Sequence, residues 1–140
     1  MRITLTTLQQ HVKNNNKFSV LTCYDATFAK ILEGAGVDVL LIGDSLGNVL
    51  KGESTTLSVT LDDMIYHTRF VSSGSNRALI MADMPFGSYQ QSPQQAFDNA
   101  SKILAAGAHM VKIEGGQVMA ETTAFLTQRG IPVCAHIGLM

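Results

Sequence analysis

A parallel α/β fold is the class that this 140-residue sequence predicts, and two observations carry the prediction. Short apolar runs recur without the strict alternation of a half-buried strand, which is typical of parallel strands covered on both faces. Segments with helical capping signals separate these runs, and strands that alternate with helices form parallel sheets. The five apolar runs are residues 18–22, 37–43, 78–82, 109–113 and 131–135.

Capping residues place the helices between these runs. Asp25, Thr60 and Ser92 each stand directly before an expected helix, where their side chains can accept from free backbone N–H groups. Gln95 is placed to complete a capping box with Ser92, and Gly34 suits the left-handed residue that ends a helix. The expected crossover helices cover residues 26–33, 61–73, 93–106 and 117–128, and a further helix over residues 5–13 precedes the first strand.

The periodicity alone leaves two architectures open, an open doubly wound sheet and a segment of a barrel. Right-handed crossovers are expected in both, because strand twist dictates that hand. A complete (βα)8 barrel usually needs about 250 residues. A barrel would therefore stop just after its fifth strand in this chain of 140 residues.

Composition and charge describe a globular protein. The chain is 46% hydrophobic and 15% charged with a net charge of −1, which gives no electrostatic reason to expect nucleic acid as a partner. The longest apolar run, residues 37–42, is too short to span a bilayer, and no signal peptide is expected at the N-terminus. We expect a cytoplasmic protein whose Cys23 and Cys134 are free thiols in a reducing compartment.

Ionisable residues stand at the carboxyl ends of all five expected strands. In order, these residues are Asp25, Asp44, Asp83, Glu114 and His136. In a parallel sheet these ends lie on one face, which is where α/β folds bind ligands. Converging carboxylates would repel one another unless a hard cation joined them, and Mg²⁺ prefers oxygen ligands. We therefore hypothesise that Asp44 and Asp83 ligate Mg²⁺, with Glu114 acting directly or through water.

Two further side chains extend this hypothesis. Lys112 lies two residues from Glu114 and shares its face, so its ammonium suits the carboxylate of a small acid substrate. Cys134 and His136 share a face by the same rule.

Each of these residues also has an ordinary structural interpretation. Asp25 is explained by N-capping, and Asp44 and Asp83 are also turn-forming residue types. Lys112 could be an edge lysine, and a lone histidine such as His136 is more often a hydrogen-bonded structural residue. The coincidence of carboxylates at successive strand ends favours the metal interpretation over separate turns.

Several motifs resemble those of the ketopantoate hydroxymethyltransferases, and they occur in the family's order nearly from end to end of the chain. Each is weak alone, and together they are highly specific. The matching segments are residues 22–25, 40–47, 66–68, 82–86, 110–116 and 132–139.

The resemblance implies a (βα)8 barrel that transfers a hydroxymethyl group from 5,10-methylenetetrahydrofolate to 3-methyl-2-oxobutanoate in pantothenate biosynthesis. It implies that Asp44 and Asp83 hold Mg²⁺ with Glu114 close to the metal. It also implies that Ser45 and Lys112 contact the oxo acid, that His136 lines the same pocket, and that Asp44 and Asp83 reach the substrate through the metal.

The family's chain is nearly twice as long, so residues 1–140 are expected to be the N-terminal part of one barrel domain, truncated after strand five. The family's general base, a later glutamate, has no counterpart before Met140, and the catalytic residue therefore stays unassigned. Open sheet edges and an uncovered inner face predict a homo-oligomer or completion by another chain.

Two alternative functions stay open at this point. One is another Mg²⁺–enolate enzyme of the phosphoenolpyruvate mutase and isocitrate lyase type. The other is a catalytically incomplete half-barrel that binds metal and oxo acid or only self-associates.

Overall fold

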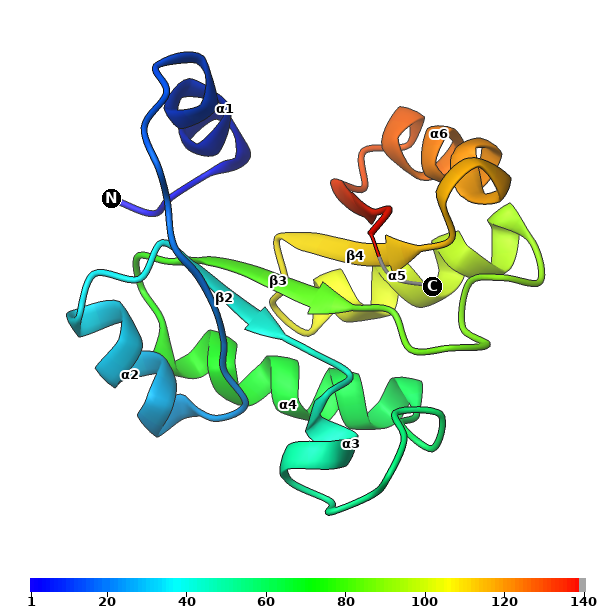
Figure 1. The fold of residues 1–140 in the computed structure, drawn as a ribbon, viewed down its shortest axis with the longest axis horizontal. Coiled ribbons are helices and arrows are strands. Elements are labelled where there is room, and N and C mark those ends of the chain that lie inside the picture. The colour runs from blue at the N-terminus through cyan, green and yellow to red at the C-terminus, as the bar shows by residue number, and fades with distance from the viewer. Residues whose placement is uncertain (139–140) are drawn as a thin grey trace.

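The strands form one parallel sheet in chain order. The computed structural model describes residues 1–138, and Figure 1 shows their arrangement. The sheet order is β1-β2-β3-β4-β5, with every neighbouring pair parallel. Its strands are β1 Val20–Thr22, β2 Val39–Ile42, β3 Leu79–Asp83, β4 Met110–Glu114 and β5 Val133–His136. All five predicted strands are confirmed, and each begins one or two residues later than predicted.

Helices connect the strands as predicted, with two additions. The short α3 was not predicted, and the last crossover begins with the 3₁₀ turn η1 rather than as one continuous helix. Gly34 lies inside its helix, and Gly36, with φ 94°, takes the left-handed conformation instead. The helices are α1 Leu5–Lys13, α2 Ala26–Gly34, α3 Leu46–Val49, α4 Leu61–Gly74, α5 Pro93–Ala105, η1 Gly116–Met119 and α6 Ala120–Gln128.

The predicted N-caps are confirmed, and the predicted capping box differs in one bond. Asp25 accepts from the backbone N–H of Phe28 at 2.8 Å, which starts α2. Ser92 accepts from the N–H of Gln95 at 3.1 Å. The Gln95 side chain accepts from the N–H of Gln91 rather than from that of Ser92, so it closes the turn one residue earlier.

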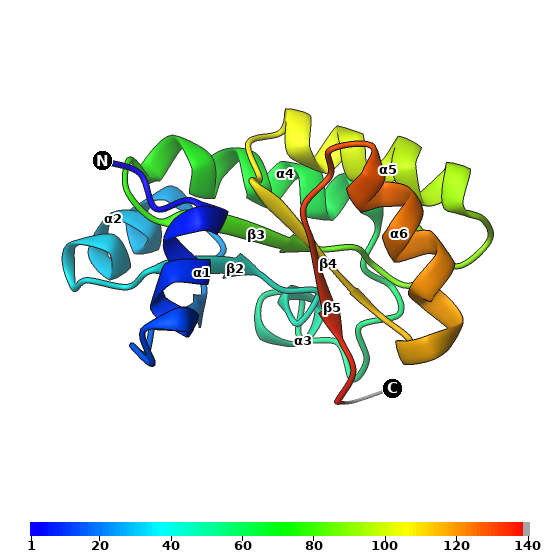
Figure 2. The same ribbon diagram turned by 90° about the horizontal axis from the view of Figure 1, so that it is seen from above.

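The two faces of the sheet are covered differently. Helices α2, α4, α5 and α6 pack on the outer face over the larger apolar core (Figure 2). On the inner face, Val39, Leu79, Met81 and Met110 pack against Leu8 of α1. A groove of about 640 Å³ remains between α1 and this inner face.

Burial on both faces was predicted for every strand, and this prediction is wrong for β1 and for β5, which is only half-buried with Ala135 exposed. All three residues of β1 are exposed, including Val20 at 41% and Leu21 at 48%. The reason is geometric, because β1 is an edge of the described sheet and pairs only with β2. The central strand β3, which has a strand on each side, is buried throughout.

Both cysteines are free thiols, as predicted. Burial raises the pKa of Cys23, which is 1% exposed. Among residues 1–138, no helix is both long enough and apolar enough to cross a membrane.

Glu33, in the last turn of α2, organises the chain that leads into β3. Its carboxylate accepts from the Ser75 hydroxyl at 2.5 Å and from the backbone N–H groups of Asn76 at 3.0 Å, Arg77 at 2.8 Å and Ala78 at 2.8 Å. Burial alone would raise the pKa of Glu33, but these hydrogen bonds outweigh it and lower the pKa to about 2.

Replacing Glu33 by glutamine is expected to lower the free energy of unfolding at pH 7 by about 1–2 kcal/mol. The pKa shift from 4.5 to about 2 corresponds to about 3 kcal/mol at face value, and solvent around this half-buried group reduces it. Because the folded-state pKa is depressed, the stabilisation is complete above about pH 4.5 and disappears as the pH falls towards 2. Urea titrations at pH 7 and at low pH should therefore show the variant and the parent converging in acid.

The exposed Glu121, changed in the same way, serves as the control and should alter stability by less than about 0.5 kcal/mol. An equal loss for both substitutions, or a Glu33 effect independent of pH, would contradict this assignment.

Candidate functional site

The register of the sheet brings the predicted site residues together at the carboxyl ends of β3, β4 and β5. Asp83 is the register partner of Lys112, and Glu114 is the partner of His136. Paired residues of parallel strands project to the same side, so side chains from three strands converge there. The predicted shared face of Lys112 and Glu114 is confirmed, because their charged atoms lie 3.2 Å apart.

Two ion pairs and a hydrogen bond join these four side chains. The Lys112 ammonium lies 2.9 Å from Asp83 Oδ1 and 3.2 Å from Glu114 Oε1. Glu114 Oε1 in turn lies 2.9 Å from Nδ1 of His136. Asp83 and Lys112 are the inner members, with side chains 8% and 15% exposed, whereas Glu114 and His136 are about 40% exposed.

Asp83 is the most buried charged group of the site. Its Oδ2 accepts from the backbone N–H of Asp44 at 3.0 Å. Its Oδ1 is buried, and its partner is the Lys112 ammonium in the ion pair at 2.9 Å. Burial raises the pKa of the Asp83 carboxyl, and the charge of Lys112 opposes that shift.

Lys112 supplies positive charge to a site otherwise rich in carboxylates. Burial alone would lower the pKa of its ammonium group, but Asp83 and Glu114 outweigh this effect and raise the pKa. Lys112 is therefore a charged, oriented donor at neutral pH, as recognition of an anionic ligand requires.

A pocket of about 200 Å³ opens beside these ion pairs. Its lining combines three carboxylates and one ammonium group with apolar side chains. Its lining consists of Asp44, Thr56, Leu57, Asp83, Met84, Phe86, Tyr89, Lys112 and Glu114. Three carboxylates against one ammonium group give the pocket lining a net negative charge, which suits a cation.

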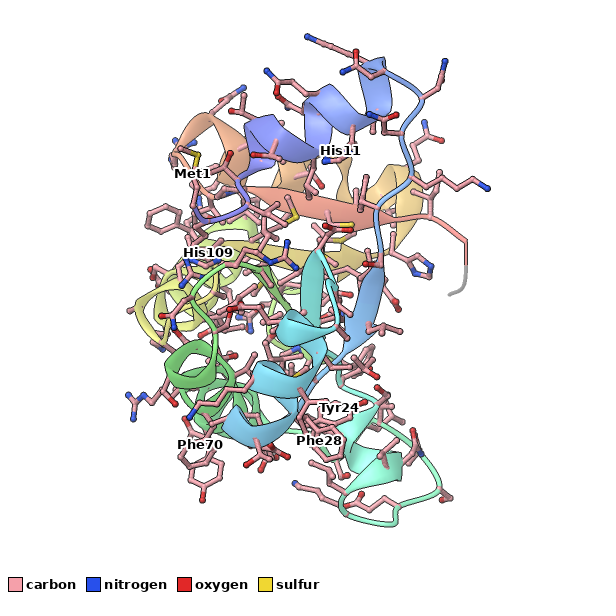
Figure 3. All side chains as sticks on the ribbon, turned by 90° about the vertical axis from the view of Figure 1, so that its left-hand side faces the viewer. Met1, His11, Tyr24, Phe28, Phe70 and His109 are labelled. Atoms are coloured by element: carbon pink, nitrogen blue, oxygen red, sulfur yellow. The ribbon has the colours of Figure 1, made fainter. Side chains whose placement is uncertain are left out.

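Two predicted substrate-binding residues lie outside this lining. His136 is not a lining residue, but its Nδ1 contacts the lining residue Glu114 at 2.9 Å. Ser45, beside Asp44, forms a hydrogen bond of 2.8 Å with the Tyr24 hydroxyl. Tyr24 and Phe28 line a neighbouring pocket of about 250 Å³, and Figure 3 shows the two aromatic side chains together.

Three residues of the site region escaped the sequence analysis. The Tyr24 hydroxyl holds Ser45, and Nδ1 of His67 lies 2.8 Å from the Tyr24 carbonyl oxygen. The hydroxyl of Tyr89 accepts from the backbone N–H of Glu114 at 3.1 Å. Tyr24 and His67 do fall in the short family-like motifs at residues 22–25 and 66–68, which was the available signal. Nothing in the local sequence distinguishes Tyr89.

Burial raises the pKa of Tyr89, and the nearby charge of Glu114 acts in the same direction. Tyr89 therefore keeps its proton at neutral pH and remains a hydrogen-bond donor.

The donor set of the pocket fits a hard divalent cation. Asp44, Asp83 and Glu114 all line it, and their carboxylates supply the oxygen ligands that such a cation prefers. Within residues 1–138, no three ligand-type side chains already stand in a closed metal-binding arrangement. Part of the reason is that the Lys112 ammonium stands between Asp83 and Glu114.

Comparison with known proteins decides which family the chain belongs to. The family model described as ketopantoate hydroxymethyltransferase matches residues 2–140. The chain belongs to the ketopantoate hydroxymethyltransferase family. Residues 22–25, 40–47, 66–68, 82–86 and 110–116 of the family-like segments lie in the described structure; the last segment, residues 132–139, ends at Leu139, which lies outside the described residues.

Curated relatives of the family are closely similar to this chain. The 3-methyl-2-oxobutanoate hydroxymethyltransferase of Nitrosomonas europaea is 68% identical over 139 residues, which are 99% of this chain and 52% of that protein. The enzyme of the same name from Nitrosospira multiformis is 65% identical over 139 residues, covering 99% of this chain and 53% of that protein. The chain thus spans about half the length of the curated relatives that it matches.

Solved structures show the same fold at low sequence identity. A 2,3-dimethylmalate lyase of the phosphoenolpyruvate mutase and isocitrate lyase superfamily matches with TM-score 0.70 and 20% identity, over 98% of this chain and 52% of that chain. A phosphonopyruvate hydrolase in complex with oxalate and Mg²⁺ matches with TM-score 0.71 and 15% identity. The match covers 93% of this chain and 50% of that chain. This chain is thus of the (βα)8-barrel class, with five strands among residues 1–138.

Proposed function

We propose that this chain carries the metal and oxo-acid site of a 3-methyl-2-oxobutanoate hydroxymethyltransferase. The observation that carries the proposal is the convergence of Asp44, Asp83, Lys112 and Glu114 on one pocket. Membership of the family supplies the substrate class, because the curated relatives are named for that oxo acid. The reaction is the transfer of a hydroxymethyl group from 5,10-methylenetetrahydrofolate, which gives 2-dehydropantoate.

The pocket residues divide into metal-holding and anion-binding roles. Asp44 and Asp83 would hold Mg²⁺ and through it the oxo acid, with Glu114 as a direct or water-mediated ligand. Bound Mg²⁺ would act as a Lewis acid that polarises the ketone of the oxo acid. The Mg²⁺ and oxalate in the phosphonopyruvate hydrolase of similar fold support this class of ligand.

Lys112 and Ser45 are assigned to the oxo acid itself. The ammonium of Lys112 would orient the anionic end of the substrate and balance its charge. Ser45, held by the Tyr24 hydroxyl at 2.8 Å, would contact the oxo acid, and His136 would line the complete pocket through its link to Glu114. The apolar side chains of Leu57, Met84 and Phe86 would then face the isopropyl group, because all other pocket walls are polar.

The chemistry needs removal of the proton at C3 of the oxo acid. Lys112, as a fixed positive charge, stabilises the negative charge that this step delocalises towards the ketone oxygen. Overall, a C3–CH₂OH bond replaces the C3–H bond. The folate supplies the carbon, water supplies the hydroxyl oxygen, and the C3 proton and a water proton end on two folate nitrogens.

We assign the proton-abstracting base to the part of the curated relatives that this chain does not span. We place residues 1–140 as the N-terminal part of a single (βα)8-barrel domain in the cytoplasm. The competing proposal is a half-barrel that binds metal and oxo acid without turnover, and the half-length match of 52% is what favours it.

We also propose that the chain self-associates. The edge strand β1 is exposed along its whole length, and the inner face carries an apolar groove of about 640 Å³. Exposed edges and apolar surfaces of this kind favour pairing with another chain.

Supplying the other half of the Nitrosomonas europaea relative in trans tests the proposed function. We expect 2-dehydropantoate, measured by mass spectrometry, only when both halves, Mg²⁺ and both substrates are present. Light scattering should show the chain alone as oligomers and the mixture as a discrete complex of the two halves. A complex that forms without turnover would favour the non-catalytic half-barrel, and a stable monomer of the chain alone would contradict self-association.

A further inference from the structure

Tyr89 lines the pocket, and the proton of its hydroxyl has no acceptor among residues 1–138. The side chain is 4% exposed and lines the pocket together with Asp83, Lys112 and Glu114. Its hydroxyl oxygen accepts from the backbone N–H of Glu114 at 3.1 Å. A phenol that accepts one hydrogen bond still has its O–H to donate. Among residues 1–138, the Glu114 contact is the single hydrogen bond of this hydroxyl.

The loop that carries Tyr89 is fixed on both sides of it. The Asn99 side chain of α5 donates to the Ser88 carbonyl at 2.8 Å, and the Gln95 side chain donates to the Gly87 carbonyl at 2.9 Å. The Gln90 side chain accepts from the Gly87 N–H at 2.7 Å. A rigid donor at a binding site costs little ordering entropy when a ligand arrives.

The balance of donors and acceptors in the pocket indicates which ligand atoms the Tyr89 hydroxyl can bind. Asp44, Asp83 and Glu114 contribute only acceptors when ionised. Two of the three ammonium hydrogens of Lys112 face Asp83 and Glu114 already. A 2-oxo acid consists of acceptor oxygens at its polar end, so it needs donors that the carboxylates cannot give. Tyr89 is a buried donor in this lining, and its O–H has no protein acceptor among residues 1–138.

We propose that Tyr89 donates a hydrogen bond from its hydroxyl to an oxygen of the bound 2-oxo acid. The inference rests on the proposed function, because it takes the oxo acid as the ligand. In this role Tyr89 touches the substrate, and the bond that its oxygen accepts from the backbone N–H of Glu114 orients the hydroxyl. Tyr89 was not among the predicted site residues, and it adds a neutral donor to the charged one, Lys112.

The test replaces Tyr89 by phenylalanine, which removes the hydroxyl and leaves the buried ring. Isothermal titration would measure Mg²⁺ alone, and then 3-methyl-2-oxobutanoate at saturating Mg²⁺. We expect the Mg²⁺ affinity to change less than about twofold and the oxo-acid affinity to fall about 10- to 100-fold, as for loss of one hydrogen bond to a charged acceptor. Tyr66, which is 59% exposed, gives the matched phenylalanine control and should change neither value.

A purely structural role for the hydroxyl would lower both affinities together, since it would displace Glu114, and that result overturns the proposal. Unchanged oxo-acid affinity overturns it as well. If the unaltered chain binds Mg²⁺ but no oxo acid, the proposed function itself has failed, and the two failures are thus distinguishable.

A second measurement does not depend on the variant folding. The ¹³Cζ resonance of Tyr89 in the unaltered chain should move when the oxo acid is added to the Mg²⁺-loaded protein, while that of Tyr66 stays in place. A Tyr89 resonance that does not move while the oxo acid binds would overturn the proposal.

Discussion

Changing Asp83 to asparagine is expected to weaken Mg²⁺-dependent binding of 3-methyl-2-oxobutanoate by about 100-fold or more. Asp83 is 6% exposed and lines the pocket, and its carboxylate, paired with Lys112 at 2.9 Å, is one of three that can attract a cation there. Asparagine keeps the shape and can still accept from the N–H of Asp44. The loss should therefore come from the missing charge rather than from a disturbed loop, and isothermal titration measures it directly.

The same substitution at Asp98, an exposed residue of α5, provides the control for a changed net charge. Asp98→Asn should leave the affinities for Mg²⁺ and for the oxo acid within about twofold of the parent's. Its charge is exposed and outside the pocket lining, so salt screens it. If Asp83→Asn bound Mg²⁺ and oxo acid as the parent does, Asp83 would be a structural partner of Lys112 and nothing more.

Changing Gly74 to alanine is expected to destabilise the fold by about 2–4 kcal/mol, although alanine is the better helix former. A Cβ at Gly74 would lie 2.4 Å from the carbonyl oxygen and 2.7 Å from the Cα of Ala26. Both contacts are with backbone, so no side chain can move aside. Helix α2 would have to separate from α4, and these two helices lie side by side in Figure 1. Urea unfolding followed by circular dichroism measures the loss.

Gly34 offers the matched control, since it also lies in a helix and a Cβ there would meet nothing within 4 Å. Gly34→Ala should be neutral or stabilising by up to about 1 kcal/mol. Equal effects of the two substitutions would mean that the close approach of α2 to α4 does not limit stability.

Local signals in the sequence predicted much of the fold. The N-caps Asp25, Thr60 and Ser92 each form their expected hydrogen bond, because capping depends on a residue and its third neighbour. The strand ends at Asp83 and Glu114 were placed correctly or within one residue, since a carboxylate follows each apolar run. The exposed strand β1 was not predicted, because its apolar residues look the same whether or not another strand covers them.

The site was predictable in composition and not in its contacts. Asp44, Asp83, Lys112 and Glu114 were singled out by their position at strand ends, and they do line one pocket. The ion pair between Lys112 and Asp83 depends on the register of β3 with β4, which no local pattern specifies. The contact of Tyr89 with Glu114 joins residues 25 positions apart through an irregular loop, so it required the tertiary structure.

The electrostatic arrangement connects these findings to the proposed chemistry. Lys112 balances Asp83 and Glu114 in the described chain, and its raised pKa keeps it charged. A divalent cation held by Asp83 would take over part of that balance. The ammonium group would then be available for an anionic ligand, which accounts for the order in which Mg²⁺ and the oxo acid are expected to bind.

The most direct test of the central claim is a titration of 3-methyl-2-oxobutanoate into the 140-residue chain, once with excess Mg²⁺ and once with EDTA. We expect saturable binding of the oxo acid with Mg²⁺. With EDTA we expect no binding, or binding at least about 100-fold weaker. Equal binding in both buffers would show that the carboxylates do not act through a metal. The absence of binding in both would show that residues 1–140 do not carry the oxo-acid site.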